Sequence, residues 1–278
     1  MIIDTHLHVV DPWVLDYPWL ANVPALNQAW PYAAYELEAR RAGISCALHM
    51  EVDVAEERIE DETNYIETLA SRPGSLIAGA IASCRPEHAG FAAYLDRQRQ
   101  NPMVKGFRRV LHVVPDELSE QPLFRENIAR MSGSGLTFDI CMLPHQLPNA
   151  MALADLAPDV TFVLDHCGVP DIKGDVRQPW HDNIAELAKR PNVVAKISGV
   201  VAYADPDTWI AETLRPWAEH TISSFGWDRV VWGSDWPVCT PGGGLLAWVA
   251  ATHALLNGAS ADEKQKLLSG NARRLWRL

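Results

Sequence analysis

The sequence predicts a single α/β domain, a (β/α)8 barrel covering residues 1–278. Short apolar runs alternate with stretches of helical spacing along the whole chain. The runs recur at intervals of roughly 25–40 residues, which implies right-handed crossovers and a parallel sheet. Eight such repeats are what a closed barrel requires. The alternative is a doubly wound open sheet, but no G-x-G-x-x-G fingerprint follows the first run.

Each expected strand is a β-branched or apolar run that ends in polar or turn residues. The eight strands are expected at Ile2–His6, Ile44–Met50, Leu76–Ala82, Val104–Val110, Leu136–Cys141, Val160–Asp165, Val193–Ile197 and Val230–Trp232. Glycine, proline or asparagine residues mark the ends of the intervening helices. These helices are expected at Tyr35–Ala42, Glu56–Ser71, Pro86–Gln100, Leu123–Ser132, Asn149–Leu156, Pro179–Lys189, Asp207–Ser224 and Leu245–Leu256.

Two further segments depart from the repeat. Val10–Pro31 follows the first strand and is rich in proline and tryptophan. In a barrel such a long loop lies on the catalytic face, so we expect it to form a lid or a pocket wall. Ser260–Trp276 predicts a C-terminal helix, because Ser260 and Glu263 have the spacing of a capping box.

The charge, the cysteine pattern and the amino-terminal sequence indicate which partners and which cellular compartment to expect. The formal net charge is −11, which argues against a nucleic-acid or anionic-membrane surface. The five cysteines are irregularly spaced without a C-x-x-C pair, so a reducing cytoplasm is the expected location. The start MIIDTHLHVVD lacks the pattern of a signal peptide, and no apolar stretch is long enough to span a bilayer.

Polar residues gather at the carboxyl ends of the expected strands. In a parallel barrel these ends meet at one mouth, so we expect residues far apart in sequence to face one another there. The groups are His6-x-His8, His49-x-Glu51, Arg108-Arg109, Asp165-His166, Lys196-x-Ser198 and Ser234-Asp235.

The first and last of these groups carry the strongest chemical signal. His6 and His8 are two residues apart and project from one face of a strand. Two such imidazoles can bind one metal ion or aim two donors at one oxygen. Asp235 stands where an apolar strand ends, and a carboxylate there can deprotonate water or ligate a metal. The alternatives are histidines with a structural role and an aspartate that caps a turn.

Neighbouring residues in a strand point to opposite faces. Only one of Asp165 and His166 is therefore expected to face the mouth. The same rule separates Arg108 from Arg109, and we expect one of these guanidinium groups to bind a carboxylate or several substrate oxygens.

The motifs IDTHLH, GFRR, FVLDHCG, WGSDWP and GNARRLW together resemble the amidohydrolase superfamily. The chain looks most like its amidohydrolase-2 branch, which contains L-fuconolactonase, L-rhamnonolactonase and pyrone-dicarboxylate lactonase. The resemblance covers nearly the whole chain and implies that Asp235 is the general base. The fourth run ends in Arg108-Arg109, and the fifth lacks a histidine, although His145 lies slightly beyond it. These departures argue against a binuclear centre.

The expected activity is hydrolysis of a sugar-acid lactone, so the expected partner is a small molecule. A homo-oligomer is among the expected states of the chain. Asp235 deprotonates water, while three imidazoles polarise the carbonyl directly or through one divalent ion, with zinc the first choice. The candidate catalytic residues are Asp235, His6, His8 and His166, and the candidate metal ligands are His6, His8, Asp235, Glu51 and His166. The candidate substrate-binding residues are Arg108, Arg109, Trp236, Trp30 and His145.

Two alternatives stay open from the sequence. One is a zinc-dependent decarboxylase of an aromatic or enoic acid, which the same branch contains. The other is a barrel that binds a sugar acid without turning it over. Ligand binding alone needs no general base, so the combination of three histidines with Asp235 favours an enzyme.

Overall fold

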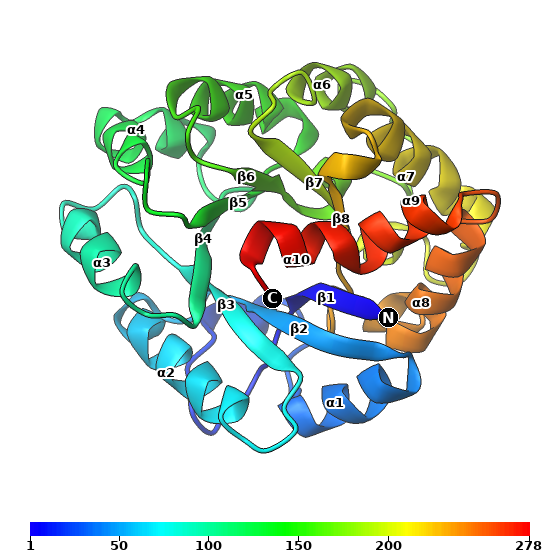
Figure 1. Cartoon of the computed structure of the whole chain (residues 1–278), viewed down its shortest axis with the longest axis horizontal. Coiled ribbons are helices and arrows are strands. Elements are labelled where there is room, and N and C mark those ends of the chain that lie inside the picture. The colour runs from blue at the N-terminus through cyan, green and yellow to red at the C-terminus, as the bar shows by residue number, and fades with distance from the viewer.

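A computed structural model describes residues 1–278 and contains one sheet of eight parallel strands in sequential order (Figure 1). Leu7 and Trp236 form the parallel bridge that brings the last strand back to the first. The His8 amide donates to the Trp236 carbonyl at 2.8 Å across the same seam. The predicted barrel is therefore confirmed. Its strands are β1 (Ile2–Leu7), β2 (Ile44–Met50), β3 (Ile77–Ser83), β4 (Val104–Val110), β5 (Thr137–Cys141), β6 (Phe162–Leu164), β7 (Val193–Ile197) and β8 (Val230–Trp232).

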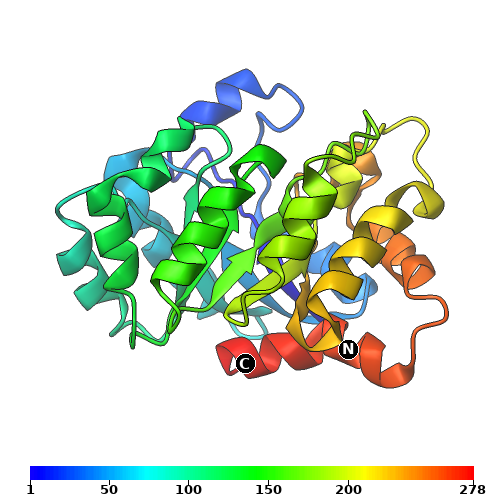
Figure 2. The same cartoon turned by 90° about the horizontal axis from the view of Figure 1, so that it is seen from above.

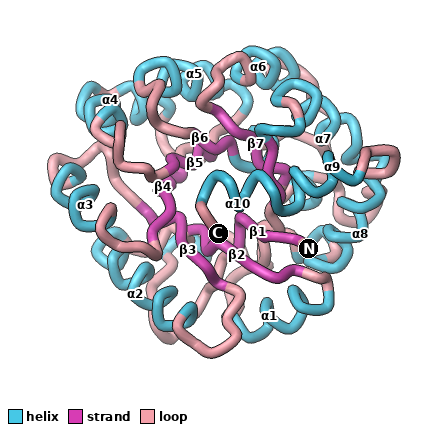
Figure 3. The backbone as a smooth tube through the Cα atoms, viewed as in Figure 1, coloured by secondary structure: helices cyan, strands magenta, loops and turns pink.

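The helices form a ring around the strands (Figure 3). The main core of 64 buried residues lies between this ring and the outer face of the barrel. The eight helices of the repeat are α1 (Tyr32–Arg41), α2 (Ile59–Ala70), α3 (Phe91–Gln98), α4 (Pro122–Ala129), α5 (Leu147–Leu156), α6 (Trp180–Leu187), α7 (Ala211–Phe225) and α8 (Gly244–Leu255).

Helix α3 begins later than the sequence indicates. The expected range started at Pro86, but the helix starts at Phe91. The amide of Asn127 donates to the carbonyl of Pro86 at 2.8 Å and to that of His88 at 3.2 Å. Because a side chain from the next helix satisfies these carbonyls, the segment before α3 does not need helical hydrogen bonds.

The C-terminal segment closes the amino-terminal end of the barrel. It consists of α9 (Ala261–Gln265), a π-helical turn at Lys266–Gly270 and α10 (Asn271–Trp276). The expected capping box is present, since the Glu263 amide donates to the Ser260 hydroxyl at 3.2 Å. Trp276 is buried against the inward-facing side chains of the strands, and its indole N–H donates to the Thr137 hydroxyl at 3.2 Å. In Figure 1 α10 accordingly lies across the centre of the barrel.

The long loop after β1 covers the opposite end (Figure 2). It contains the 3-10 helix η1 (Pro18–Asn22), and an antiparallel bridge between Val10 and Trp30 ties its two ends together. Its apolar side chains form a small core of their own with residues that follow β2. The loop therefore lies over the carboxyl ends of the strands, as the sequence indicated. None of the helices combines the length and apolar character that a bilayer crossing needs.

Candidate functional site

The seam between β1 and β8 brings three of the expected residues together. His6 lies in β1, His8 follows it, and Asp235 follows β8. The Nε2 atoms of His6 and His8 are 3.2 Å apart. Asp235 Oδ1 lies 3.3 Å from His8 Nε2 and 3.6 Å from His6 Nε2. These three residues, which the sequence places at strand ends, therefore lie together in the structure.

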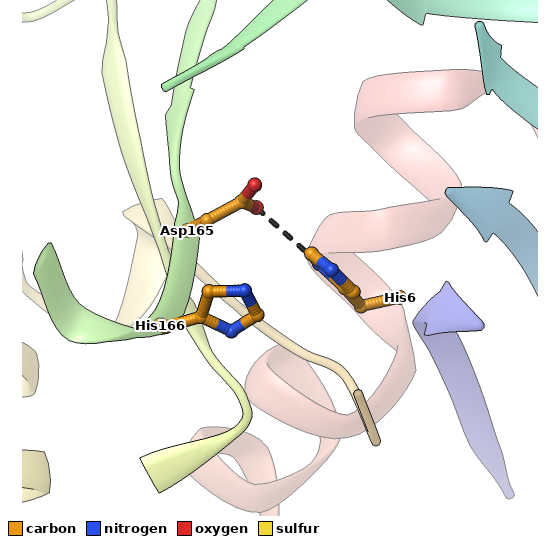
Figure 4. A group of neighbouring side chains, drawn as sticks. All are labelled: His6, Asp165 and His166. Carbon is orange, nitrogen blue, oxygen red and sulfur yellow. Dashed lines mark ion pairs between the residues drawn. The ribbon is translucent and has the colours of Figure 1, made fainter. Parts of the chain in front are cut away.

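Asp165 and His166 both contact this cluster, but only His166 lines the cavity described below, as expected for a pair of which one faces the mouth. β6 ends at Leu164, and His166 lies in the left-handed region at φ +53°. Strand alternation no longer applies beyond that point. Asp165 Oδ1 lies 3.4 Å from His6 Nδ1 (Figure 4). His166 Nδ1 lies 3.8 Å from Asp235 Oδ2.

The buried ammonium group of Lys196 contacts His6 and two carboxylates beside the cluster. Lys196 Nζ lies 2.7 Å from Asp139 Oδ2, 2.9 Å from Asp165 Oδ1 and 3.3 Å from His6 Nδ1. All of these side chains are inaccessible to solvent. Burial alone raises the pKa of Asp165, but Lys196 and His6 outweigh it and hold that pKa well below its usual range. Burial lowers the pKa of His6, so its imidazole is neutral.

Lys196 is among the strand-end residues expected at the mouth, but the sequence assigns it no chemical role, and Asp139 is not among the candidates. The available signal was one charged residue inside each of two apolar strands, at Phe138-Asp139-Ile140 and Ala195-Lys196-Ile197. Isolated buried charges are unfavourable, so two opposite charges on strands of one barrel point to a pair.

The two neighbouring arginines point in opposite directions, as expected. Arg108 enters the barrel, where its Nε lies 2.6 Å from Glu51 Oε1 and its Nη1 lies 3.5 Å from Asp165 Oδ2. Arg109 instead pairs with Glu87 at 2.9 Å, away from the cluster. The second oxygen of Glu51 accepts the Asp53 amide at 2.8 Å. Glu51 is thus occupied by other partners, and the structure does not place it with His6, His8 and Asp235.

Three further expected substrate-binding residues, like Arg109, lie outside the cavity. Trp236 is 2% exposed, and its ring packs against Trp30 and against Tyr35 of α1, with ring centroids 5.7 and 5.6 Å away. Neither tryptophan lines the cavity described below. Trp236 is an apolar residue at the barrel seam, so it buries its ring against the helix behind the seam. His145 is exposed and lies 3.1 Å from Asp116.

A cavity of about 340 Å³ lies between the cluster and the loop after β1. His8, His166, Asp235 and Arg108 line it, whereas His6 is buried underneath. This volume is at the lower end of the range for small-molecule sites, which is about 300–1,000 Å³. The loop supplies Trp19 to the cavity, in place of the tryptophan expected there.

The donor atoms in this cluster fit a divalent ion. His8 Nδ1 lies 2.9 Å from the Met50 carbonyl, which can only accept, so Nδ1 carries the proton and Nε2 presents a lone pair. Asp235 Oδ2 is buried and has no hydrogen-bond partner. A Cβ on Gly199, at φ +63°, would lie only 2.4 Å from that oxygen, so glycine keeps this space open. Two imidazoles and a carboxylate are a common ligand set for zinc.

The closed parallel barrel carries this cluster at the carboxyl ends of its strands, where barrel enzymes place their catalytic groups. Residues 3–278 match the family model described as Amidohydrolase, and the chain belongs to that family. An L-fucono-1,5-lactonase of Burkholderia multivorans is 28% identical over 298 residues, covering 99% of this chain and 96% of that protein. The enzyme of the same name from Burkholderia ambifaria is 28% identical over 226 residues, covering 79% of this chain and 77% of that protein.

A solved amidohydrolase structure from Burkholderia multivorans with bound zinc shares the fold. Its TM-score is 0.88 at 25% identity, with 100% of this chain and 99% of that chain covered. The family match confirms the expected hydrolase class. The donor set, together with this zinc-bound structure, supports a site for a divalent metal.

Proposed function

We propose that the chain hydrolyses the lactone of a sugar acid to the open-chain acid. The observation that carries this proposal is the meeting of His8, His166 and Asp235 at a cavity, with His6 buried directly against them. Relatives named L-fucono-1,5-lactonase and L-rhamnono-gamma-lactonase support the substrate class. A lactone is an ester, so its opening needs an activated water and a stabilised oxyanion.

Asp235 serves as the general base. Asp235 lines the cavity and its Oδ2 has no hydrogen-bond partner, so this oxygen is free to accept the proton of the attacking water. The water oxygen then bonds to the carbonyl carbon. When the ring C–O bond breaks, the leaving oxygen takes a proton back from Asp235. A positioned base of this kind contributes about 10²–10⁴ in rate.

His8, His166 and Arg108 line the cavity around this base. His166 and Arg108 carry N–H groups that can point at the carbonyl oxygen, where negative charge develops. The Glu51 carboxylate, 2.6 Å from Arg108 Nε, holds the guanidinium in place. Loss of one oxyanion donor typically costs about 3–4 kcal/mol of transition-state stabilisation.

His6, His8 and Asp235 would hold a divalent ion. Such an ion supplies polarisation of the carbonyl and lowers the pKa of a bound water. The tautomer of His6 then has a defined role. His6 Nδ1 lies 3.4 Å from Asp165 Oδ1 and 3.3 Å from Lys196 Nζ. With its proton on Nδ1, directed at Asp165, His6 would present the Nε2 lone pair to the ion beside His8 and Asp235. In a version that uses imidazoles alone, His6 Nδ1 accepts from Lys196 and Nε2–H donates to His8.

Replacement of the base tests this proposal. Asp235→Asn keeps the size of the side chain and removes the proton acceptor, so we expect turnover to fall by about 10²–10⁴. Acid release from a panel of five- and six-membered aldonolactones, followed with a pH indicator, measures this. Unfolding by urea checks that the variant is folded.

Asp182→Asn is the matched control, because Asp182 is an exposed aspartate on α6. Its activity should equal that of the wild type. Asp235→Asn activity within tenfold of wild type would contradict the assignment of the base. Release of CO₂ from an aromatic or enoic acid, without opening of any lactone, would favour the decarboxylase instead.

A further inference from the structure

Two residues at the cavity, His112 and Cys141, form a contact that the proposed mechanism does not use. Cys141 ends β5, and His112 is the second residue after β4. The Cys141 Sγ and His112 Nδ1 atoms are 3.1 Å apart, and both residues line the cavity. Cys141 is buried, whereas His112 is partly exposed. The pair therefore faces the same cavity as the catalytic cluster, from the side of β4 and β5.

The backbone between the two strands fixes this contact. Val110 and Cys141 are partners in the register of β4 with β5. Beyond them, the Leu111 amide donates to the Cys141 carbonyl at 3.2 Å, and the Leu111 carbonyl accepts from the Gln146 side chain at 3.1 Å. Because both backbone groups of Leu111 are held, the next residue, His112, has a fixed position beside Cys141.

The contact also decides which nitrogen of His112 carries the proton. Burial raises the pKa of the Cys141 thiol, so the sulfur keeps its hydrogen. Burial, together with the nearby charge of Arg108, lowers the pKa of His112 to about 4, so the imidazole is neutral near neutral pH. Sulfur is a weak acceptor, so the thiol donates to Nδ1 and the ring proton lies on Nε2.

The Nε2–H group of His112 has no partner within the protein. The contact with Cys141 is the one hydrogen bond that the His112 side chain makes. Since His112 lines the cavity, a bound molecule can supply the missing acceptor.

The charges that line the cavity favour an uncharged acceptor. The one guanidinium group there, that of Arg108, lies 2.6 Å from Glu51 and 3.5 Å from Asp165, so its charge is already balanced. The Asp235 carboxylate also lines the cavity. A second carboxylate on the substrate would meet this negative charge and no free cation. The acceptor that suits His112 is therefore a hydroxyl oxygen.

We infer that His112 is a substrate-binding residue that donates a hydrogen bond from Nε2 to a ring hydroxyl of the lactone, and that Cys141 is a positioning residue that holds the imidazole in this tautomer. The ester group lies at His8, His166 and Asp235, and the hydroxyl lies on the side of β4 and β5. This inference rests on the proposed lactonase function and adds the residue by which the site recognises a hydroxylated ring.

Substrate analogues test the hydrogen bond. The aldonolactone that the wild type hydrolyses fastest is compared with its monodeoxy analogues, each of which lacks one ring hydroxyl. His112→Phe keeps a ring and removes the donor, so we expect kcat/KM to fall about tenfold on the parent lactone. On one deoxy analogue, the one without the bound hydroxyl, the variant should equal the wild type. The ratio of wild type to variant cancels the differing reactivity of the lactones.

Two further variants control this comparison. His112→Gln keeps an N–H donor at a similar distance and should retain most of the activity on the parent lactone. His253→Phe, at an exposed histidine of α8 outside the cavity, should reproduce the wild type on every analogue. Urea unfolding checks that each variant is folded.

Thiol variants test the role of Cys141. Cys141→Ala removes the donor to Nδ1, so the two tautomers of His112 mix, and we expect kcat/KM on the parent lactone to fall about three- to tenfold. Cys141→Ser restores a donor and should recover most of this loss. In a His112→Phe background, Cys141→Ala should have no further effect, because the two residues act through one contact. Cys46→Ala, in β2 and outside the cavity, is the matched control.

NMR of the imidazole nitrogens measures the tautomer without any substrate. The signals of His112, identified by their loss in His112→Phe, should be those of the Nε2–H form in the wild type and in Cys141→Ser. In Cys141→Ala they should shift toward an average of the two forms. A wild-type His112 with its proton on Nδ1 would overturn the inference, whatever the lactone assays give.

The outcomes separate this inference from the function on which it rests. If His112→Phe has no effect, or lowers kcat/KM equally for the parent lactone and every deoxy analogue, the inference is wrong and the lactonase stands. If the wild type opens no lactone of the panel, both are wrong.

Discussion

Two residues with unusual backbone conformations direct their side chains into the site. His166 and Asp235 have φ values of +53° and +59°, in the left-handed region that side chains other than glycine rarely adopt. Such a conformation costs about 1–3 kcal/mol and persists only where the surroundings impose it. The Asp235 amide donates to the His6 carbonyl at 2.8 Å, which holds the bend after β8. The strain turns each side chain toward the cluster.

Lys196 is the residue on which the buried charges depend. Lys196→Met keeps the length of the side chain but leaves Asp139 and Asp165 without their ammonium partner. We expect the free energy of unfolding to fall by about 3–5 kcal/mol, because breaking a buried ion pair leaves uncompensated charge. We also expect kcat to fall about 10–100-fold, as for other residues that orient a catalytic or metal-binding histidine. Urea unfolding and lactone hydrolysis measure the two effects.

A second variant keeps this prediction informative if the first is too unstable. Lys196→Met combined with Asp139→Asn removes one of the stranded carboxylates, so part of the stability should return while kcat stays low. Lys189→Met, at an exposed pair with Glu186, should change neither quantity. Full activity of a folded Lys196→Met protein would show that the lysine does not position His6.

The site residues differ in how well the sequence predicts them. His6 and His8 share one strand face, so their spacing alone indicated that they act together. Only His166 of the Asp165–His166 pair lines the cavity, as expected, but the turn after β6 and not strand alternation sets the two directions. Glu51 lies at a strand end, as His8 and Asp235 do, but it pairs with Arg108 and not with them. Arg108 comes from another strand, so no local pattern in the sequence reveals this pair.

At the scale of elements, the two segments outside the repeat close the two ends of the barrel. The loop after β1 lines the cavity above the cluster, and α10 fills the amino-terminal end. Both were visible in the sequence as departures from the repeat. Their packing partners were not, because Trp276 contacts strand residues far away along the chain.

Trp276→Ala tests the role of α10. The substitution removes a large buried ring and leaves the Thr137 hydroxyl without its donor, so we expect a loss of about 3–5 kcal/mol in the free energy of unfolding. Chemical denaturation measures it. Arg273→Ala is the control, because Arg273 is an exposed residue of the same helix. A Trp276→Ala protein as stable as the control would mean that α10 does not hold the barrel together.

At the scale of the whole molecule, barrel closure links metal binding to stability. His6 and His8 come from one end of the chain and Asp235 from the other, so an ion that they share binds only the folded state. Zinc at 100 times its dissociation constant should add about 2.7 kcal/mol. For a chain of this size Tm should rise by about 2–4 °C per kcal/mol, as measured by calorimetry on chelator-treated protein.

His8→Ala should abolish this rise in Tm, whereas His253→Ala, at an exposed histidine of α8, should keep it. An equal rise in the wild type and in His8→Ala would place the ion elsewhere. Full lactonase activity in metal-free protein, with no change of Tm on addition of zinc, would favour the version that uses imidazoles alone.

The sequence by itself determined the eight-fold alternation, the barrel class, the capped C-terminal segment and the residues at the seam. These features depend on periodicity and spacing, which are local properties of a chain. Only the tertiary structure decided that Asp165 joins His166 at the site, that Lys196 and Asp139 support it, and that Trp236 faces away. Burial and charge pairing between distant strands exist only after the barrel has closed, so no local pattern can specify them.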